Sequence, residues 1–290
     1  MPVFSYVLAD VFTDRPFGGN PLAVLPDAAG LTGAQMQAIA REFNLSETTF
    51  VTPGSKPGQW KVRIFTPGGE LLFAGHPIVG TAVVLQSLGR VQGGETVLEL
   101  GVGPVRVVVG QEQATFFRNG PPEIRAVGIS DTELAALVGA PGLGGTAFEA
   151  GYGTSFLYVK LPDRAAVAAA RLRGDLWQEA EARLWGHGVY VYALTGVQEG
   201  VTQVHARMFA PGVGVAEDPA TGSAAACLTG ALPGPAEGVH HIAIAQGIEM
   251  GRPSMIHGTA TRVGGSVTGI SIGGGAVIIG DGRLTRLPAA

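Results

Sequence analysis

Cysteine and charged residues are scarce in this chain of 290 residues. The single cysteine, Cys227, excludes an intramolecular disulfide and fits a reducing compartment. Only 14% of the residues are charged, the formal net charge is −4, and no basic block occurs, so the composition argues against a nucleic-acid partner. Because 46% of the residues are hydrophobic, a sizeable core is expected and disorder is not.

Long apolar runs and the common ligand-binding motifs are also missing. No uninterrupted apolar stretch approaches the roughly 20 residues of a membrane helix, and residues 1–6 do not open a signal peptide. There is no HExxH, CxxC or Walker A sequence. Residues 142–147 match GxGxxA, but they follow a helical pattern and precede a strand, the reverse of the dinucleotide-binding order. We expect a cytoplasmic globular protein with no metal, no membrane and no nucleic-acid partner.

What the chain does contain is a repeated pattern. Residues 63–67 (RIFTP) are followed by a loop and by 75–82 (GHPIVGTA), and residues 207–211 (RMFAP) are followed by a similar loop and by 217–224 (EDPATGSA). Each copy predicts a strand, a loop and a helix, which we call the first and the second corner. The flanking strands and helices recur in the same order and at similar spacing, which indicates gene duplication.

The predicted fold is α+β, with two similar domains that are each a mixed β-barrel around a central apolar helix. Helices at 77–88 and 219–231 are apolar on nearly every side, as expected of helices that are buried all round. The first domain is expected to span 1–119 with a C-terminal strand at about 279–290, and the second to span 120–278.

Local signals place other elements. Apolar spacing predicts an amphipathic helix over 31–43 and helical sequence over 163–185. Residues 130–133 (SDTE) match a capping box. Glycine is plentiful, and the run at 273–275 predicts a turn between two short strands, 266–271 and 275–279.

The two corners place unlike proton carriers at equivalent positions. Pro77 and Pro219 suit the first helical position, which puts His76 and Asp218 at or beside the N-caps. Alone, Asp218 is more often a cap than a catalyst, and His76 is more often a structural histidine. The matched corners favour function, because helix N-termini offer free N–H groups and a partial positive charge to an anion.

Small and polar residues at the two helix starts suit a ligand. Gly80 and Gly222 are expected in the first turns, where they would let a ligand approach the backbone. Thr81 and Ser223 add hydroxyl groups at equivalent places. Two such termini facing one cleft would hold a small molecule that carries a carboxylate.

Glu47 is an acid without a counterpart in the second half of the chain. It lies between an amphipathic helix and a strand, and the equivalent position is near 188–189. Most glutamates lie on the surface. In an apolar cleft, however, the pKa of Glu47 would be raised enough for it to accept a proton from carbon and return it.

These residues also carry a family resemblance that extends from about residue 4 to the C-terminus. The motifs are Phe17–Pro21, Ser46–Thr48, Arg63–Pro67, Phe73–Ala82, Phe209–Pro211 and Glu217–Ala224. Together they resemble the phenazine-biosynthesis isomerase family, known as PhzF-like proteins. The resemblance implies the diaminopimelate epimerase fold with an active site between two domains. It also implies a cofactor-independent isomerase that is commonly a homodimer.

The resemblance assigns roles to individual residues. It implies that Glu47 moves a proton between substrate carbons, and that His76 and Asp218 bind substrate and relay protons. The expected substrate-binding residues are Asn20, Gly75, Thr81, Gly222 and Ser223. Related racemases use a cysteine pair at the two helix termini. Cys227 lies one turn further along, so two-thiol racemisation is disfavoured.

The predicted function is isomerisation of a small carboxylate-bearing metabolite through proton abstraction and return by Glu47. Whether the proton returns to another carbon or to another face of the same carbon is left open. A serine hydrolase stays a weaker alternative, because Ser223 lacks the GxSxG elbow. The main alternative is a non-catalytic protein of the same fold that binds a small molecule or another protein.

Overall fold

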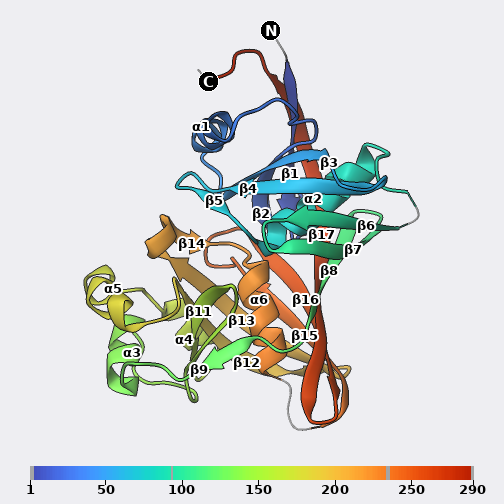
Figure 1. Cartoon of the computed structure of the whole chain (residues 1–290). Helices are drawn as coiled ribbons and strands as arrows, with labels where there is room; N and C mark the ends of the chain where they lie inside the picture. The colour runs from blue at the N-terminus through green and yellow to red at the C-terminus, as the bar shows by residue number, and fades with distance from the viewer. Residues whose placement is uncertain (1–2, 93, 233–235, 289–290) are drawn as a thin grey trace. The chain divides into compact units, whose positions relative to one another are not determined.

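The computed structural model describes residues 3–92, 94–232 and 236–288, which form two compact units (Figure 1). The first unit comprises residues 1–117 and 273–290, and the second comprises residues 118–272. The chain therefore leaves the first unit once and returns to it through its last strand.

Eight strands of the first unit close into a ring. They are β1 (Phe4–Val11), β2 (Asn20–Leu25), β3 (Glu47–Pro53), β4 (Gln59–Phe65), β6 (Glu95–Leu100), β7 (Gly103–Gly110), β8 (Gln113–Asn119) and β17 (Ser266–Leu284). Each strand pairs with the next in this order, and β17 pairs with both β8 and β1. The β2–β3 and β4–β6 pairs are parallel, so the mixed barrel expected for this half is confirmed. A short strand, β5 (Glu70–Leu71), pairs with β4.

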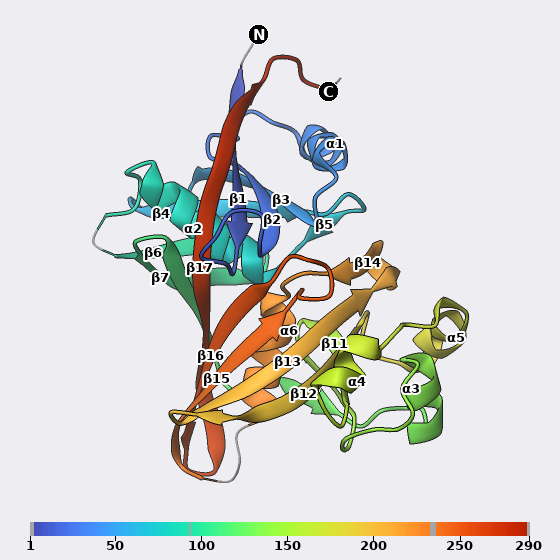
Figure 2. The ribbon, with the colours of Figure 1, turned by 180° about the vertical axis from the view of Figure 1, so that it is seen from behind.

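Helix α2 (Gly75–Ser87) fills the first barrel. All its residues from Gly75 to Leu85 are buried, and it contacts β1, β2, β3 and β7 (Figure 2). A Cβ atom at Gly80 would lie 2.6 Å from side-chain atoms of Leu22 and Val11. Gly80 lies in the second turn of α2 and allows close helix–strand packing. The expectation that it opens the first turn to a ligand is therefore wrong.

The amphipathic helix predicted over 31–43 is confirmed as α1 (Gly33–Phe43). Thr32 and Gln35 form a capping box at its start, and its apolar side faces β3 and β4. Buried residues of α1 and the strands form one hydrophobic cluster: Phe4, Leu25, Ala28, Leu31, Met36, Ile39, Ala40, Phe50 and Phe65.

The second unit repeats this order of elements. Its strands are β9 (Glu123–Arg125), β10 (Phe148–Tyr152), β11 (Thr154–Lys160), β12 (Val189–Gln198), β13 (Val201–Ala210), β14 (Val215–Asp218), β15 (Gly238–Gln246) and β16 (Ser254–Val263). The β11–β12 and β13–β15 pairs are parallel, as are β2–β3 and β4–β6. Helix α6 (Gly222–Ala231) connects β14 to β15, is almost wholly buried, and contacts β10, β11, β15 and β16.

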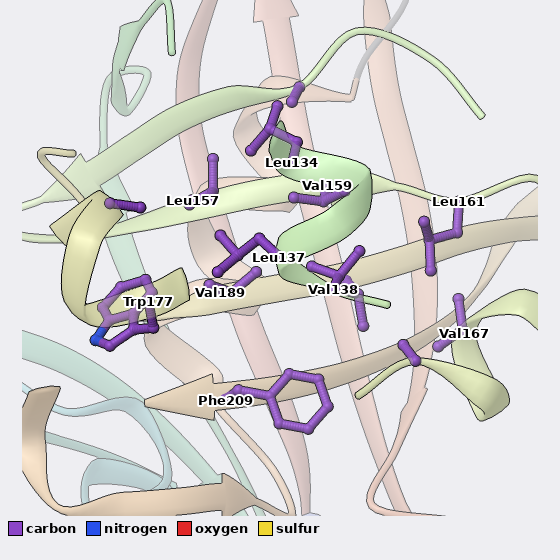
Figure 3. Close-up of a cluster of buried hydrophobic side chains, with 14 of the residues drawn as sticks. Leu134, Leu137, Val138, Leu157, Val159, Leu161, Val167, Trp177, Val189 and Phe209 are labelled. Atoms are coloured by element: carbon purple, nitrogen blue, oxygen red, sulfur yellow. The ribbon is translucent and has the colours of Figure 1, made fainter. Parts of the chain in front are cut away.

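Short helices cover the outer face of β11, β12 and β13. They are α3 (Asp131–Leu137), α4 (Arg164–Ala169), α5 (Gly174–Ala180) and the 3₁₀ turn η1 (Glu181–Arg183). Figure 3 shows Leu134 and Leu137 of α3 directed at the side chains of the strands beneath, within one buried cluster. The capping box predicted at 130–133 is confirmed, because Ser130 and Glu133 bond each other's backbone N–H groups.

Both helix starts differ from the expectation. Helix α2 begins at Gly75 after the N-cap Ala74, so His76 and Pro77 lie inside the first turn. Proline fits there because the first N–H groups of a helix have no partner inside the helix. Helix α6 begins at Gly222, so Pro219 precedes it, and Asp218 ends β14 because that strand continues to pair with β13.

The glycine run at 273–275 is not a turn. Residues 266–284 form the single strand β17, and the last two residues of the expected strand at 279–290 lie outside the described residues. A Cβ atom at Gly273 would lie 2.3 Å from Thr115 Oγ1, and one at Gly275 would lie 2.5 Å from the carbonyl oxygen of Thr13. These glycines therefore let neighbouring segments approach closely. The actual turn is Gly264–Gly265, where both φ angles are positive.

Candidate active site

In the first unit, an acid and a histidine meet at the start of α2. Glu47 is the first residue of β3, and His76 is the second residue of α2. Oε2 of Glu47 lies 3.4 Å from Nε2 of His76. The side chain of His76 is 3% exposed and that of Glu47 is 15% exposed, so Glu47 is shielded less completely from solvent than the ring.

Asn20 sets the tautomer of His76. Its Nδ2 atom lies 3.1 Å from Nδ1 of the ring, and an amide nitrogen can only donate. Nδ1 is therefore the acceptor, and the ring proton lies on Nε2, facing Glu47. Burial lowers the pKa of His76 to about 3, so the ring is neutral near pH 7. The contact thus joins a carboxyl group to a neutral imidazole N–H and is not an ion pair.

A contact between two hydroxyl groups connects α2 to β3, the strand that carries Glu47. Oγ1 of Thr81 lies 2.9 Å from Oγ1 of Thr49, and both residues are fully buried. Thr81 lies in the second turn of α2, while Gly75 is the first residue of the helix. This contact fixes β3 relative to α2 two residues after Glu47.

The start of α2 carries no side-chain cap among the residues that the structure describes. The helices α1 and α3 on the barrel exteriors both have complete capping boxes. Leaving the N–H groups of α2 without a side-chain acceptor preserves the partial positive charge of the helix end, as an anion-binding site requires.

In the second unit, the corresponding corner centres on Asp218. The hydroxyl of Thr221 donates to Oδ2 of Asp218 at 2.6 Å. Thr221 is the N-cap residue of α6, and Gly222 and the half-buried Ser223 are its first two helical residues. Within the described residues, no side chain caps this helix either.

Residues that the sequence did not single out form hydrogen bonds to this corner from neighbouring strands. Gln246 on β15 donates from Nε2 to the carbonyl of Asp218 at 2.8 Å and to Oγ1 of Thr221 at 3.0 Å. Tyr190 on β12 donates its hydroxyl to Oε1 of Gln246 at 3.0 Å. Ser254 on β16 donates to the carbonyl of Pro219 at 2.8 Å. No motif or spacing connects these residues in the sequence.

Glu47 has no acidic counterpart at the equivalent strand position of the second unit. In the parallel β2–β3 pair, Glu47 opens β3 opposite Leu22, and in the parallel β11–β12 pair, Val189 opens β12 opposite Leu157. A valine thus occupies in the second unit the place that the acid occupies in the first.

Cys227 is unsuited to proton transfer. It is 1% exposed within α6, and burial raises the pKa of its thiol to about 12. The thiolate would be the reactive form, and it is scarce at neutral pH. This agrees with the expectation that two-thiol racemisation is disfavoured.

Of the predicted residues, His76 contacts both Asn20 and Glu47 in the first unit, and Asp218 contacts the start of α6 in the second. That the residues of the two units form one active site stays a prediction. A mixed barrel that presents a carboxyl group to a neutral histidine beside an uncapped helix start carries the kinds of group that acid–base catalysis uses.

The comparisons with known proteins identify the family. A family model described as phenazine biosynthesis-like protein matches residues 9–282, and the chain belongs to this family. It is 42% identical to an uncharacterised isomerase of Mesorhizobium japonicum, over 98% of this chain and 99% of that one. It is 35% identical to the trans-2,3-dihydro-3-hydroxyanthranilate isomerase of Pseudomonas chlororaphis, over 96% of this chain and 98% of that one.

The fold agrees with a solved structure of the same family. The Bacillus anthracis phenazine biosynthesis protein of the PhzF family superimposes with a TM-score of 0.85 at 24% identity, covering 99% of this chain and all of that one. The prediction that the chain is a PhzF-like isomerase is confirmed. In the part of the chain that the structure describes, no helix is long and apolar enough to cross a membrane.

Proposed function

We propose that this isomerase acts without a cofactor on a small metabolite that carries a carboxylate, with Glu47 as the group that removes and returns the proton. The observation that supports this most is the 3.4 Å approach of Oε2 of Glu47 to Nε2 of a neutral, buried His76. A half-buried carboxylate beside a neutral ring nitrogen is suited to general base catalysis.

In the proposed reaction, Glu47 takes a proton from a carbon next to an activating group. The C–H bond breaks, an O–H bond forms on Glu47, and the electron pair moves into the neighbouring unsaturated system. The proton then returns to a different carbon or to the other face, which restores the carboxylate. The Nε2–H of His76 donates to the carboxylate of Glu47, or to a substrate oxygen that gains negative charge. The His76 ring stays neutral throughout.

The substrate carboxylate is proposed to lie at the helix starts. Gly75, Gly222 and Ser223 contribute backbone N–H groups from the first turns of α2 and α6, and both starts lack a side-chain cap within the described residues. This proposal brings the two corners to one cleft between the units, with Asp218 facing a polar substrate group. Thr81 is proposed to act through its contact with Thr49, by holding β3 in place.

The first candidate substrate comes from the relatives. Three Pseudomonas proteins at 33–35% identity are named trans-2,3-dihydro-3-hydroxyanthranilate isomerases. That compound has a carboxylate, a hydroxyl group and an amino group on an unsaturated ring. It therefore offers both an anion for the helix starts and conjugation that can accept the electron pair.

Solvent deuterium exchange tests the proposal. The wild-type protein is incubated in D₂O with trans-2,3-dihydro-3-hydroxyanthranilate and with a panel of unsaturated amino and hydroxy acids, and NMR locates any deuterium on carbon. We expect incorporation into at least one compound together with formation of an isomer. If calorimetry shows tight binding of a panel compound and no compound exchanges, the proposed isomerase activity is contradicted and a binding protein is favoured.

A homodimer, implied by the family resemblance, is also proposed. Sedimentation velocity at micromolar concentration measures it directly, and a mass of one chain would contradict it.

A further inference from the structure

Four polar side chains of the second unit form a directed chain of hydrogen bonds that ends on Asp218. We propose that Gln246 is a positioning residue which, held by Tyr190, makes the hydroxyl of Thr221 donate to Asp218 and so keeps Asp218 an ionised acceptor for a donor group of the substrate. The inference rests on the proposed function in one respect, namely that Asp218 faces the substrate.

The direction of the chain follows from its ends. Oε1 of Gln246 accepts from the Tyr190 hydroxyl at 3.0 Å and from the backbone N–H of Thr221 at 3.3 Å. The amide therefore has its Nε2 atom on the other side, where it donates to Oγ1 of Thr221 and to the carbonyl of Asp218. A threonine hydroxyl has one proton, and because Oγ1 already accepts from Gln246, that proton is directed to Oδ2 of Asp218.

The environment fixes this direction. Gln246 and Tyr190 are both fully buried, so water does not compete for their polar atoms. Burial, with a further contribution from the negative charge of Asp218, raises the pKa of Tyr190 far above its usual value. Tyr190 therefore stays protonated and able to donate. The amide of Gln246 cannot reverse without turning its hydrogens toward the backbone N–H of Thr221 and its oxygen toward the carbonyl of Asp218.

The chain has a consequence for the substrate. An Asp218 oxygen that already accepts from Thr221 is stabilised in its ionised form, since a hydrogen bond to the charged form favours it. Such a carboxylate attracts an N–H or O–H group and repels another carboxylate. We therefore infer an amino or hydroxy acid, with its amino or hydroxyl group at Asp218 and its carboxylate at the uncapped helix starts.

A titration of Asp218 tests the chain without any turnover. Aspartate labelled with ¹³C at the carboxyl carbon is followed by NMR against pH, and Asp218→Asn identifies the signal. Thr221→Val removes the donated proton and Thr221→Ser restores it. Gln246→Glu replaces the amide donor by a second acceptor, which competes for the same proton.

We expect the Asp218 signal to titrate at higher pH in Thr221→Val and Gln246→Glu than in the wild type, and to be unchanged in Thr221→Ser. Ser254→Ala is the matched control. The hydroxyl of Ser254 holds the same loop through the Pro219 carbonyl and is not a member of the hydrogen-bond chain, although Ser254 pairs with Gln246 across β15 and β16. An Asp218 signal that titrates alike in the wild type, Thr221→Val and Gln246→Glu would overturn the inference, whatever the activity.

Kinetics on trans-2,3-dihydro-3-hydroxyanthranilate, or on whichever panel compound exchanges, supply the second readout. Loss of a hydrogen bond to a charged group lowers kcat/KM by about 10- to 100-fold in Thr221→Val. The acidic limb of its pH profile moves to higher pH, whereas Ser254→Ala leaves that limb in place. A shifted titration with no exchange in any compound would refute the isomerase while the hydrogen-bond chain stands.

Discussion

His76 is predicted to stay neutral, with its proton on Nε2, over the whole range from pH 8 to pH 5. Its ring is buried, its Nδ1 atom accepts from Asn20, and Nε2 faces Glu47. Burial lowers the pKa to about 3, against 6.5 for an exposed ring. A catalytic pH profile should therefore lack a limb that belongs to His76.

The same shift has a consequence for stability. In the unfolded chain His76 takes up a proton near pH 6.5, and in the folded chain only near pH 3. Between these values the unfolded state binds more protons, so the free energy of unfolding decreases as pH falls and is constant with respect to this group above about pH 6.5. At pH 5 the loss is about 2 kcal/mol, from 1.36 kcal/mol for each pH unit below the unfolded pKa.

Long-range ¹H–¹⁵N NMR of histidine-labelled protein measures the protonation state and the tautomer of His76. His76→Gln identifies the signal, and free histidine added to the sample shows the response of a titrating ring. We expect the His76 pattern of a protonated Nε2 and an acceptor Nδ1 at every pH from 8 to 5. A midpoint between pH 5 and pH 8, or a proton on Nδ1, would refute the role given to Asn20.

Three further predictions concern the framework of the site. Thr49→Val and Thr81→Val should each destabilise the protein by about 1–3 kcal/mol, because each single variant leaves one buried hydroxyl without its partner. The double variant should be destabilised by less than the sum of the two. Urea unfolding measures all three variants, and additive values would contradict the contact. Gly80→Ala should lower the midpoint of thermal unfolding, since its Cβ would collide with Leu22, and an unchanged midpoint would show that the barrel adapts. Cys227→Ala should retain exchange activity, and the native thiol should resist iodoacetamide until the protein unfolds; loss of activity with an intact fold would reopen thiol chemistry.

The sequence predicted the features that depend on local pattern. Helices at 77–88 and 219–231 have no polar face, which indicates burial on every side, and α2 and α6 are buried as expected. Their first residues were predicted wrongly, because proline is tolerated throughout the first turn and also before it. Pro77 therefore does not mark the start of α2, and Pro219 does not mark that of α6.

The site could be predicted only where a repeat or a family motif supplied a signal. The repeat identified His76, its lack of symmetry identified Glu47, and the resemblance added Asn20. The tautomer of His76 could not be predicted, because it depends on one distance between β2 and α2. Gln246 and Tyr190 were missed for the same reason, since strand pairing far along the chain brings them to the second corner.

Deuterium incorporation by Glu47→Gln tests the central claim most directly. Glutamine keeps the shape of the side chain at β3 but cannot accept a proton, and general base catalysis contributes about 10²- to 10⁴-fold. Glu42→Gln, an exposed position on α1, is the matched control for a lost carboxylate. With a compound that the wild type exchanges, we expect Glu47→Gln to lose exchange by that factor while Glu42→Gln keeps the wild-type rate. Exchange at the wild-type rate in folded Glu47→Gln would contradict the account.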